Sequence, residues 1–172
     1  MAIPSKQATP LRADELGREA GVSRHDHQAV RLWLRLLSCS TQIEQVIRTR
    51  LRSQFGTTLP RFDYLAQLQR HPQGLRMKSL SSHLMVTGGN ITGLTDQLVE
   101  EGWVERIDDP QDRRAMIVRM TPKGRTFFNR MAAEHEAWLI ELFGSMGARD
   151  MAQLHQLLGS LRQGLAQETR QE

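Results

Sequence analysis

The stretch at residues 104–124, VERIDDPQDRRAMIVRMTPKG, decides the fold of this chain of 172 residues. Two short β-prone runs flank a polar tip, and this pattern predicts a β-hairpin. The tip carries Arg113 and Arg114 beside acidic residues. Because a hairpin of this size buries little, paired arginines at its tip indicate an anionic partner. The alternative is a surface ion-pair cluster without a partner, which would add little to stability.

The residues before the hairpin predict a helix-turn-helix. A short helix is expected over residues 77–84, and a second helix runs to residue 101 from its N-cap, Thr87. Two short helices joined by a tight turn match the helix-turn-helix signature. The charged hairpin follows directly, so we expect the anion to be DNA. The inner face of the second helix is expected to consist of Ile91, Leu94 and Leu98.

The outward face of the second helix is small or polar, as a helix in the major groove requires. Its first half contains three glycines, which cost roughly 1 kcal/mol each relative to alanine. This cost indicates that the backbone approaches phosphates or base edges closely; the alternative is a locally frayed turn. The residues expected to contact DNA from the two helices are Lys78, Ser81, Ser82, Thr87, Gly88, Gly89, Asn90, Thr92, Gly93 and Gln97.

At the hairpin tip, Arg113 and Arg114 are the candidate DNA contacts. An arginine suits a narrow minor groove, because the guanidinium is always charged and the groove concentrates negative potential. We expect Asp109 or Asp112 to pair with one of these arginines and to fix the direction of the other.

Composition and cysteine usage exclude several classes of protein. The net charge of +4 is modest, so the position of charges matters more than their total. Cys39 is the only cysteine, which excludes an internal disulfide framework and a cysteine-based zinc site within one chain. No signal-peptide pattern or membrane-spanning run is present, so a cytoplasmic protein without a membrane partner is expected. No nucleophile with its base, phosphate loop or metal set indicates an enzyme, a cofactor or a bound metal.

Three motifs carry a resemblance to a known family. They are the wing sequence D-x-x-D-R-R at 109–114, the L-T-x-x-G pattern read here as MTPKG at 120–124, and L-x-x-x-G-[LW]-[VI]-x-R at 98–106. Residues 59–124 resemble the winged helix-turn-helix of the MarR family of bacterial transcription regulators, and the flanking helices agree. Family members often carry arginine where this chain has Gly93 and Gln97, which implies a different operator.

The resemblance implies a mainly α fold with a small β-wing. Residues 28–56 and 122–168 would be dimerisation helices, residues 57–121 the winged helix-turn-helix, and residues 1–27 a flexible arm. It also implies an obligate homodimer on a pseudo-palindromic operator in double-stranded DNA. The two recognition helices would then enter successive major grooves, and Arg114 would be the tip inserted into a minor groove.

The segment at 32–70, together with GGNITGLTDQL, is similar to a subgroup that senses hydroxycinnamoyl-CoA thioesters or related aromatic acids. This similarity implies a repressor that a small aromatic acid or aromatic acyl-CoA releases from DNA. Apolar side chains could line a slot for the ring, while arginines meet a carboxylate or the CoA phosphates. For the aromatics the favoured alternative is core packing, and the arginines could equally form a solvated face or contact DNA phosphates. The candidates are Trp33, Leu37, Phe62 and Tyr64 for the slot, and Arg48, Arg50, Arg52 and Arg61 for the anion.

Two other functions stay open at this point. A repressor could sense oxidants through Cys39, but its neighbours Leu36, Leu37 and Ile43 indicate a buried and unreactive thiol. A constitutive DNA-binding protein would share the wing and lack an effector.

Overall fold

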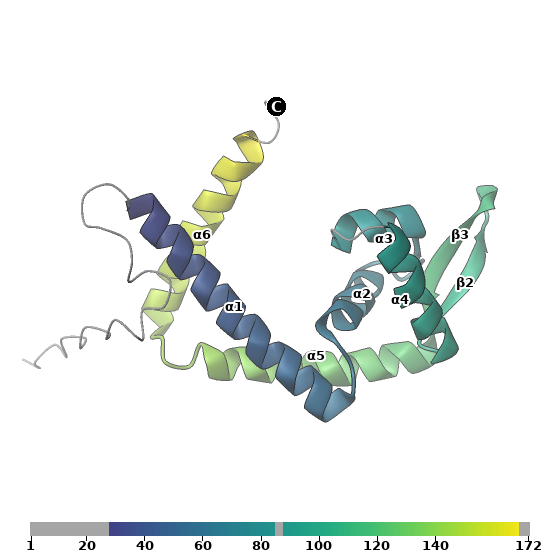
Figure 1. The fold of residues 1–172 in the computed structure, drawn as a ribbon, viewed down its shortest axis with the longest axis horizontal. Coiled ribbons are helices and arrows are strands. Elements are labelled where there is room, and N and C mark those ends of the chain that lie inside the picture. The colour runs from purple at the N-terminus through teal and green to yellow at the C-terminus, as the bar shows by residue number, and fades with distance from the viewer. Residues whose placement is uncertain (1–27, 85–87, 169–172) are drawn as a thin grey trace, which may run out of the picture. The chain divides into compact units, whose positions relative to one another are not determined.

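The computed structural model describes residues 28–84 and 88–168 and has a mainly helical fold with a small antiparallel sheet (Figure 1). The predicted fold class is therefore confirmed. The predicted arm at residues 1–27 lies outside the described residues. The elements in chain order are α1 (Gln28–Phe55), α2 (Leu59–Arg70), β1 (Leu75–Arg76), α3 (Met77–Leu84), α4 (Gly88–Glu100), β2 (Val104–Asp109), β3 (Asp112–Met120), α5 (Pro122–Leu142) and α6 (Ala148–Glu168).

The chain divides into two compact units between residues 50 and 51, within α1. The described part of the first unit is a single stretch of α1. Several of its large apolar side chains are exposed, with Leu32 at 54% and Trp33 at 60% of full accessibility. Cys39 is also exposed, which corrects the expectation of a buried thiol. Apolar neighbours in sequence did not predict burial, because Leu36 and Leu37 are half-buried while residues 39–42 are exposed.

The second unit contains the helix-turn-helix and its core. α5 runs beneath α2, and the β2–β3 hairpin projects beside α4 (Figure 1). The core side chains come from every element of this unit except α6 and the two-residue strand β1. Those that are almost fully buried include Leu51, Tyr64, Leu65, Leu68, Leu80, Ile91, Leu98, Val104, Val118 and Met131.

The sheet has the order β1-β3-β2, and both pairings are antiparallel. Both strands of the predicted hairpin extend into its polar tip, because the charged residues there continue the hairpin although they are poor strand formers. The register changes between Asp108, opposite Met116, and Asp109, opposite Asp112. Residues 113–115 are therefore extra residues on β3. β1, which pairs Leu75 with Val118, was not predicted from the sequence.

Local signals explain how the hairpin is joined to its neighbours. Gly102 ends α4 with a φ of 72°, in the left-handed region that favours glycine. Thr121 is the N-cap of α5, and its hydroxyl accepts a hydrogen bond from Gly124 N at 3.0 Å. Pro122 follows at the first helical turn, where its missing N–H does no harm.

None of the helices in the described part of the chain is both long and apolar enough to cross a membrane.

Candidate DNA-binding surface

The two faces of α4 differ sharply in burial. Asn90, Thr92, Gly93 and Gln97 are exposed, as expected for residues that meet a partner. Ile91 and Leu98, by contrast, are at most 2% exposed and pack inward. The side chain of the expected helix cap, Thr87, lies outside the described residues. Gly88 and Gly89 are the first two residues of α4.

Thr95 fixes the inner face of α4 by polar contacts. It is completely buried, and its hydroxyl donates to the Ile91 carbonyl at 2.7 Å. The hydroxyl oxygen of Tyr64 in α2 lies 2.7 Å from the hydroxyl oxygen of Thr95. Burial raises the pKa of Tyr64 to about 12, so this phenol stays protonated and can donate. The pattern of apolar residues did not indicate this role of Thr95, although the spacing from Ile91 to Leu98 places its side chain inward.

Gly93 is open on its outer side. A Cβ built there has no heavy atom within 4 Å among the described residues. Packing within the described chain therefore does not require glycine at this position. The helix nonetheless accepts the backbone freedom of a glycine in its interior, which costs about 1 kcal/mol relative to alanine.

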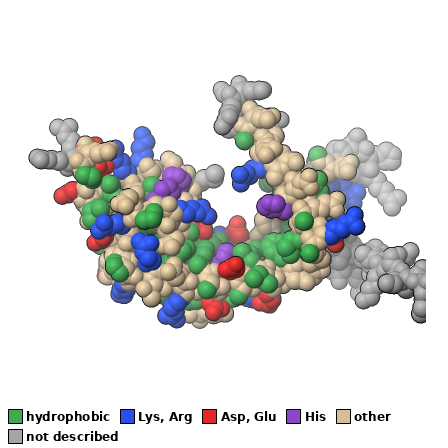
Figure 2. Space-filling view, turned by 180° about the vertical axis from the view of Figure 1, so that it is seen from behind, with side chains coloured by type: hydrophobic (Ala, Val, Ile, Leu, Met, Phe, Trp, Pro, Cys, Tyr) green, Lys and Arg blue, Asp and Glu red, His purple; other side chains and the backbone are tan. Residues whose placement is uncertain are grey.

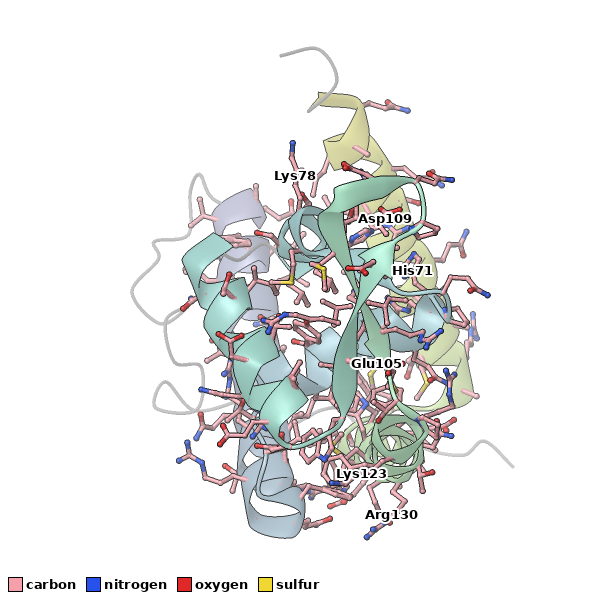
Figure 3. All side chains as sticks on the ribbon, turned by 90° about the vertical axis from the view of Figure 1, so that its right-hand side faces the viewer. His71, Lys78, Glu105, Asp109, Lys123 and Arg130 are labelled. Carbon is pink, nitrogen blue, oxygen red and sulfur yellow. The ribbon has the colours of Figure 1, made fainter. Side chains whose placement is uncertain are left out.

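In α3, Lys78 and Ser82 are exposed, while Ser81 is half-buried. Lys78 points away from the helix into solvent (Figure 3). The Ser82 hydroxyl donates to the Lys78 carbonyl at 3.1 Å, so its proton is used within the helix. Leu80, on the opposite face, is fully buried and anchors α3 in the core.

The tip end of the hairpin, where β2 ends, is held by a buried carboxylate. The Asp109 side chain is 5% exposed and accepts from Arg76 Nε at 2.6 Å and from Gln111 N at 2.8 Å. These hydrogen bonds, the one from the Gln111 backbone first, lower the pKa of Asp109. The lowered pKa means that the contact stabilises the fold above the ordinary pKa of 3.8 and that this stabilisation is lost as the pH falls through the folded-state value.

Asp109 thus pairs with Arg76 in β1, at the side of the hairpin, a partner that the sequence did not indicate. The sequence did not reveal the pair because its partners are 33 residues apart and β1 is only two residues long. The expected pairing of Asp109 or Asp112 with an arginine of the tip stays a prediction. Arg113 and Arg114 lie in β3, where the extra residues occur, and their side chains lie outside the described part of the structure.

Two further ion pairs join β2 to α4 and to β3. Arg106 in β2 pairs with Asp96 on the exposed face of α4, and Arg119 pairs with Glu105 across the hairpin at 2.7 Å. Each pair is substantially exposed, so each contributes little to stability alone. Figure 2 shows lysine and arginine side chains distributed over the helix-turn-helix part rather than gathered in one stripe.

The predicted slot for an effector is not assembled from the aromatic residues of α2. Phe62 and Tyr64 are buried in the core, where Phe62 packs against Phe128 with ring centroids 5.4 Å apart and against His135 at 4.7 Å. The alternative interpretation, core packing, describes both residues. Trp33 is largely exposed and Leu37 half-buried, both on α1.

The four candidate arginines have different surroundings. Arg48 pairs with Glu44 one helical turn away, with 3.0 Å between the charged atoms. Arg61 pairs with Glu101, and its guanidinium carbon lies 4.9 Å from the centre of the Trp103 ring. Arg50 is half-buried, and Arg52 is exposed near the end of α1. Among the residues at 28–84 and 88–168, no group of three or more metal-ligating side chains occurs.

Comparisons with known proteins agree with this architecture. A family model described as the MarR family matches residues 57–116. The transcriptional activatory protein BadR of Rhodopseudomonas palustris is 31% identical over 134 residues, which cover 76% of each chain. The transcriptional repressor MprA of Escherichia coli is 28% identical over 93 residues, 54% of this chain and 53% of MprA. A MarR family regulator from Streptomyces coelicolor, solved in complex with DNA, has a TM-score of 0.68 at 20% identity and covers 94% of this chain and 93% of its own.

Proposed function

Because this chain belongs to the MarR family of transcriptional regulators, we propose that it binds its operator as a homodimer and releases it when a small aromatic anion binds. As a family member it is a DNA-binding transcriptional regulator and not an enzyme. The proposal concerns the surfaces used, the assembly, the direction of regulation and the effector.

The observation that carries the DNA interface is the contrast between the two faces of α4. Its inner face is fixed by Ile91, Leu98 and the Thr95–Tyr64 contact, so its outer face is presented by a rigid element. A rigid polar face suits base contacts in a major groove. Base contacts are assigned to Asn90, Thr92 and Gln97, with Gly93 allowing close approach. Phosphate contacts are assigned to Lys78, Ser81, Ser82 and Thr87; for its contact, Ser82 would turn its hydroxyl proton from the Lys78 carbonyl to a phosphate oxygen.

The wing is assigned to the minor groove, with Arg114 as the inserted residue and Arg113 nearer the backbone. Its support is the anchoring of the hairpin next to its tip, where Asp109 at the end of β2 pairs with Arg76 of β1. A hairpin held at this point can keep its tip at a defined distance from the recognition helix. The charge of the tip then adds affinity that depends on salt, because bound phosphates release counterions.

The homodimer is supported by the apolar face of α6. Leu157, Leu158, Leu161 and Leu165 are between 40% and 60% exposed in this chain. A row of exposed leucines on an amphipathic helix is costly in water and favours burial against a second copy. In a symmetric dimer the two recognition helices would face successive turns of a pseudo-palindromic operator.

The direction of regulation and the effector are proposed together. Relatives include a protein named as an activator and one named as a repressor. We assign repression, with release by an aromatic acid or an aromatic acyl-CoA, on the basis of the similarity of residues 32–70 to the thioester-sensing subgroup. Arg48 and Arg52 are the candidates for CoA phosphates. Arg48→Ala or Arg52→Ala should then weaken the response to an acyl-CoA more than DNA binding.

Operator binding can be tested before any target gene is identified. Selection from random duplexes would supply an operator, and fluorescence anisotropy would compare its affinity with that of a scrambled duplex at several salt concentrations. Arg114→Ala should weaken operator binding roughly tenfold and reduce the salt slope by about one, with the dimer intact. Gln111→Ala, at the same tip but without a charge, is the control. Unchanged affinity of Arg114→Ala would remove the wing from the mechanism.

The exposure of Cys39 supports one competing function, a redox-responsive regulator. Hydrogen peroxide should then release the wild-type protein from the operator but not Cys39→Ser. A protein that neither oxidant nor any aromatic acid or thioester releases would be a constitutive DNA-binding protein.

A further inference from the structure

Two histidines from different helices meet where α2 and α3 end. His71 is the C-cap of α2, and His83 lies in the last turn of α3. Their ring centroids are 5.6 Å apart, and the ring planes are inclined by 52°. His71 is half-buried and His83 is exposed, so a small ion can reach the pair from solvent.

Both rings have the hydrogen-bonding pattern of histidines that bind a metal ion. Nδ1 of His71 lies 2.9 Å from the Gln67 carbonyl oxygen, and Nδ1 of His83 lies 2.6 Å from the Ser79 carbonyl oxygen. Because a carbonyl oxygen only accepts, each Nδ1 carries the proton, and in the neutral ring each Nε2 presents a lone pair. Among the described residues, neither Nε2 forms a hydrogen bond. Histidines that bind metal through one nitrogen typically donate the other N–H to a carbonyl or carboxylate in this way.

The separation of the two rings suits one shared ion. A zinc–nitrogen bond is about 2.1 Å long and continues the line from the ring centre through the nitrogen. Two imidazoles on one tetrahedral zinc ion therefore have centroids about 5 Å apart, close to the observed 5.6 Å. Because His83 is exposed, its side chain can close the small difference without disturbing the core.

Backbone contacts and core packing set the spacing of the two histidines. His71 N donates to the Leu68 carbonyl at 3.1 Å, and the His71 carbonyl accepts from Gly74 N at 2.8 Å. Gly74 has a φ of 91°, and a Cβ atom there would collide with β3, so this turn has little freedom. Leu80 is fully buried and anchors α3, the helix that carries His83. The pair is therefore preorganised, which lowers the entropy cost of binding an ion.

The chemistry of the pair selects a class of ion. Imidazole nitrogen suits zinc, nickel and copper, whereas magnesium and calcium prefer oxygen ligands. No third metal-ligating side chain joins the pair among residues 28–84 and 88–168. Water would therefore complete the coordination, and binding should be weaker than at a closed site with four protein ligands.

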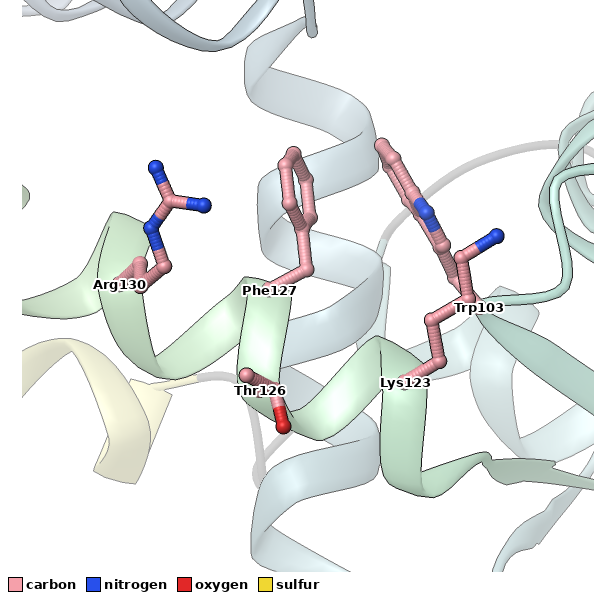
Figure 4. Close-up of a pocket in the computed structure, with 5 residues that line it drawn as sticks. All are labelled: Trp103, Lys123, Thr126, Phe127 and Arg130. Carbon is pink, nitrogen blue, oxygen red and sulfur yellow. The ribbon is translucent and has the colours of Figure 1, made fainter.

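The pocket between β2 and α5 does not compete for such an ion (Figure 4). Its charged lining groups, Lys123 and Arg130, are both cations and would repel it. Phe127 stacks on the Trp103 ring with centroids 4.1 Å apart, and the guanidinium carbon of Arg61 lies 4.9 Å from the centre of the same ring. A divalent cation is therefore favoured at the histidine pair rather than in this pocket.

We propose that His71 and His83 together bind one zinc ion, or a divalent transition-metal ion of similar chemistry, through their Nε2 atoms. The ion joins the end of α2 to the last turn of α3 and so restrains the first helix of the helix-turn-helix. Since the two ligands are held together only in the folded chain, the bound ion stabilises the fold. This site goes beyond the proposed function and does not depend on it.

The full-length protein without an affinity tag, first treated with a chelator, is titrated with zinc chloride. Calorimetry should detect one zinc ion per chain, and excess zinc should raise the midpoint of thermal unfolding by about 3 °C or more. Magnesium chloride should do neither. In long-range ¹H–¹⁵N spectra, zinc should move the Nε2 signals of His71 and His83, assigned from the variants below. The signals of His135, which packs against Phe62, should stay in place.

His71→Gln and His83→Gln each remove one ligand and keep a side-chain donor for the carbonyl. Each should weaken zinc binding at least tenfold and abolish the thermal shift, with unfolding in the absence of zinc reporting whether the variant is folded. The control is the double variant His25→Gln/His27→Gln, which removes the two histidines closest together in the sequence and should bind zinc like the wild type.

The proposed site would be overturned if the wild type bound no zinc, if zinc left both Nε2 signals unmoved, or if both single variants bound zinc like the wild type. Loss of binding only in the His25→Gln/His27→Gln variant would also overturn it. Operator affinity, measured without zinc, decides the proposed function separately.

Discussion

α4 and α6 are both amphipathic helices, but among the described residues only α4 has its apolar face covered. In α4, Ile91, Thr95 and Leu98 are at most 2% exposed, whereas in α6 Leu157 and Leu165 are 60% and 55% exposed. No residue of α6 within the described range is buried. The proposed recognition helix is therefore held in place by side chains of its own subunit, whereas the described residues leave the apolar face of α6 uncovered. In the proposed dimer, DNA reading and assembly would depend on different sets of contacts.

The largest effect is expected from a variant that prevents dimer formation and leaves the proposed recognition helix α4 intact. Leu161→Asp places a charge on the exposed apolar face of α6 and should produce a folded monomer. Because specific binding by dimeric regulators uses two half-sites, operator affinity should fall roughly a thousandfold or more. Light scattering would give the mass and anisotropy the affinity. Gln163→Asp, a polar exposed position of the same helix, should remain dimeric.

Two leucine-to-alanine variants distinguish burial within one subunit from burial in the proposed dimer interface. Leu98→Ala leaves a cavity in the core and should lower the free energy of unfolding by about 2–5 kcal/mol. Leu158→Ala, at a position 40% exposed in the single chain, should act mainly through the dimer. Chemical denaturation at several protein concentrations distinguishes them, since only the second loss should diminish when the protein is concentrated. A loss from Leu158→Ala that is independent of concentration would mean that α6 is supported within one subunit.

The hydrogen bond between Thr95 and Tyr64 should contribute less to the free energy of unfolding than the Leu98 side chain does. Thr95→Val keeps the shape of the side chain but leaves the buried Tyr64 hydroxyl without its partner. The expected loss is about 1–3 kcal/mol in the free energy of unfolding. Tyr64→Phe in the same background should restore part of it, because both polar groups are then gone. Absence of any coupling in this double-mutant cycle would show that the hydroxyls do not support α4.

The smallest expected change in stability is at the outer face. Gly93→Ala adds a methyl group into open space and should stabilise the fold by up to about 1 kcal/mol. If the backbone approaches DNA closely, the same variant should weaken operator binding. Thermal unfolding and anisotropy on one preparation would measure both effects. A more stable protein with unchanged operator affinity would leave the glycine without a role in DNA binding.

The sequence predicted the helix-turn-helix and the hairpin because these elements depend on local signals. Gly102 after α4 and the cap at Thr121 act within a few residues, and the structure contains these elements. The inner and outer faces of α4 were predicted for the same reason, since burial follows the helical period.

The features that the sequence did not predict depend on residues far apart in the chain. The Arg76–Asp109 pair requires the pairing of β1 with β3, and Tyr64 meets Thr95 only after α2 and α4 have packed. The sequence also predicted a buried Cys39, and this prediction was wrong. Apolar neighbours in sequence do not show which face of a helix is covered.

The pairing of the buried Asp109 carboxylate with Arg76 has a thermodynamic consequence for DNA binding. Since this contact orders the end of β2, next to the turn of the hairpin, when the protein folds, little backbone entropy of the hairpin remains to be lost when DNA arrives. The heat-capacity change of operator binding should therefore reflect the contact surface itself, without the additional signature of a segment that folds on binding.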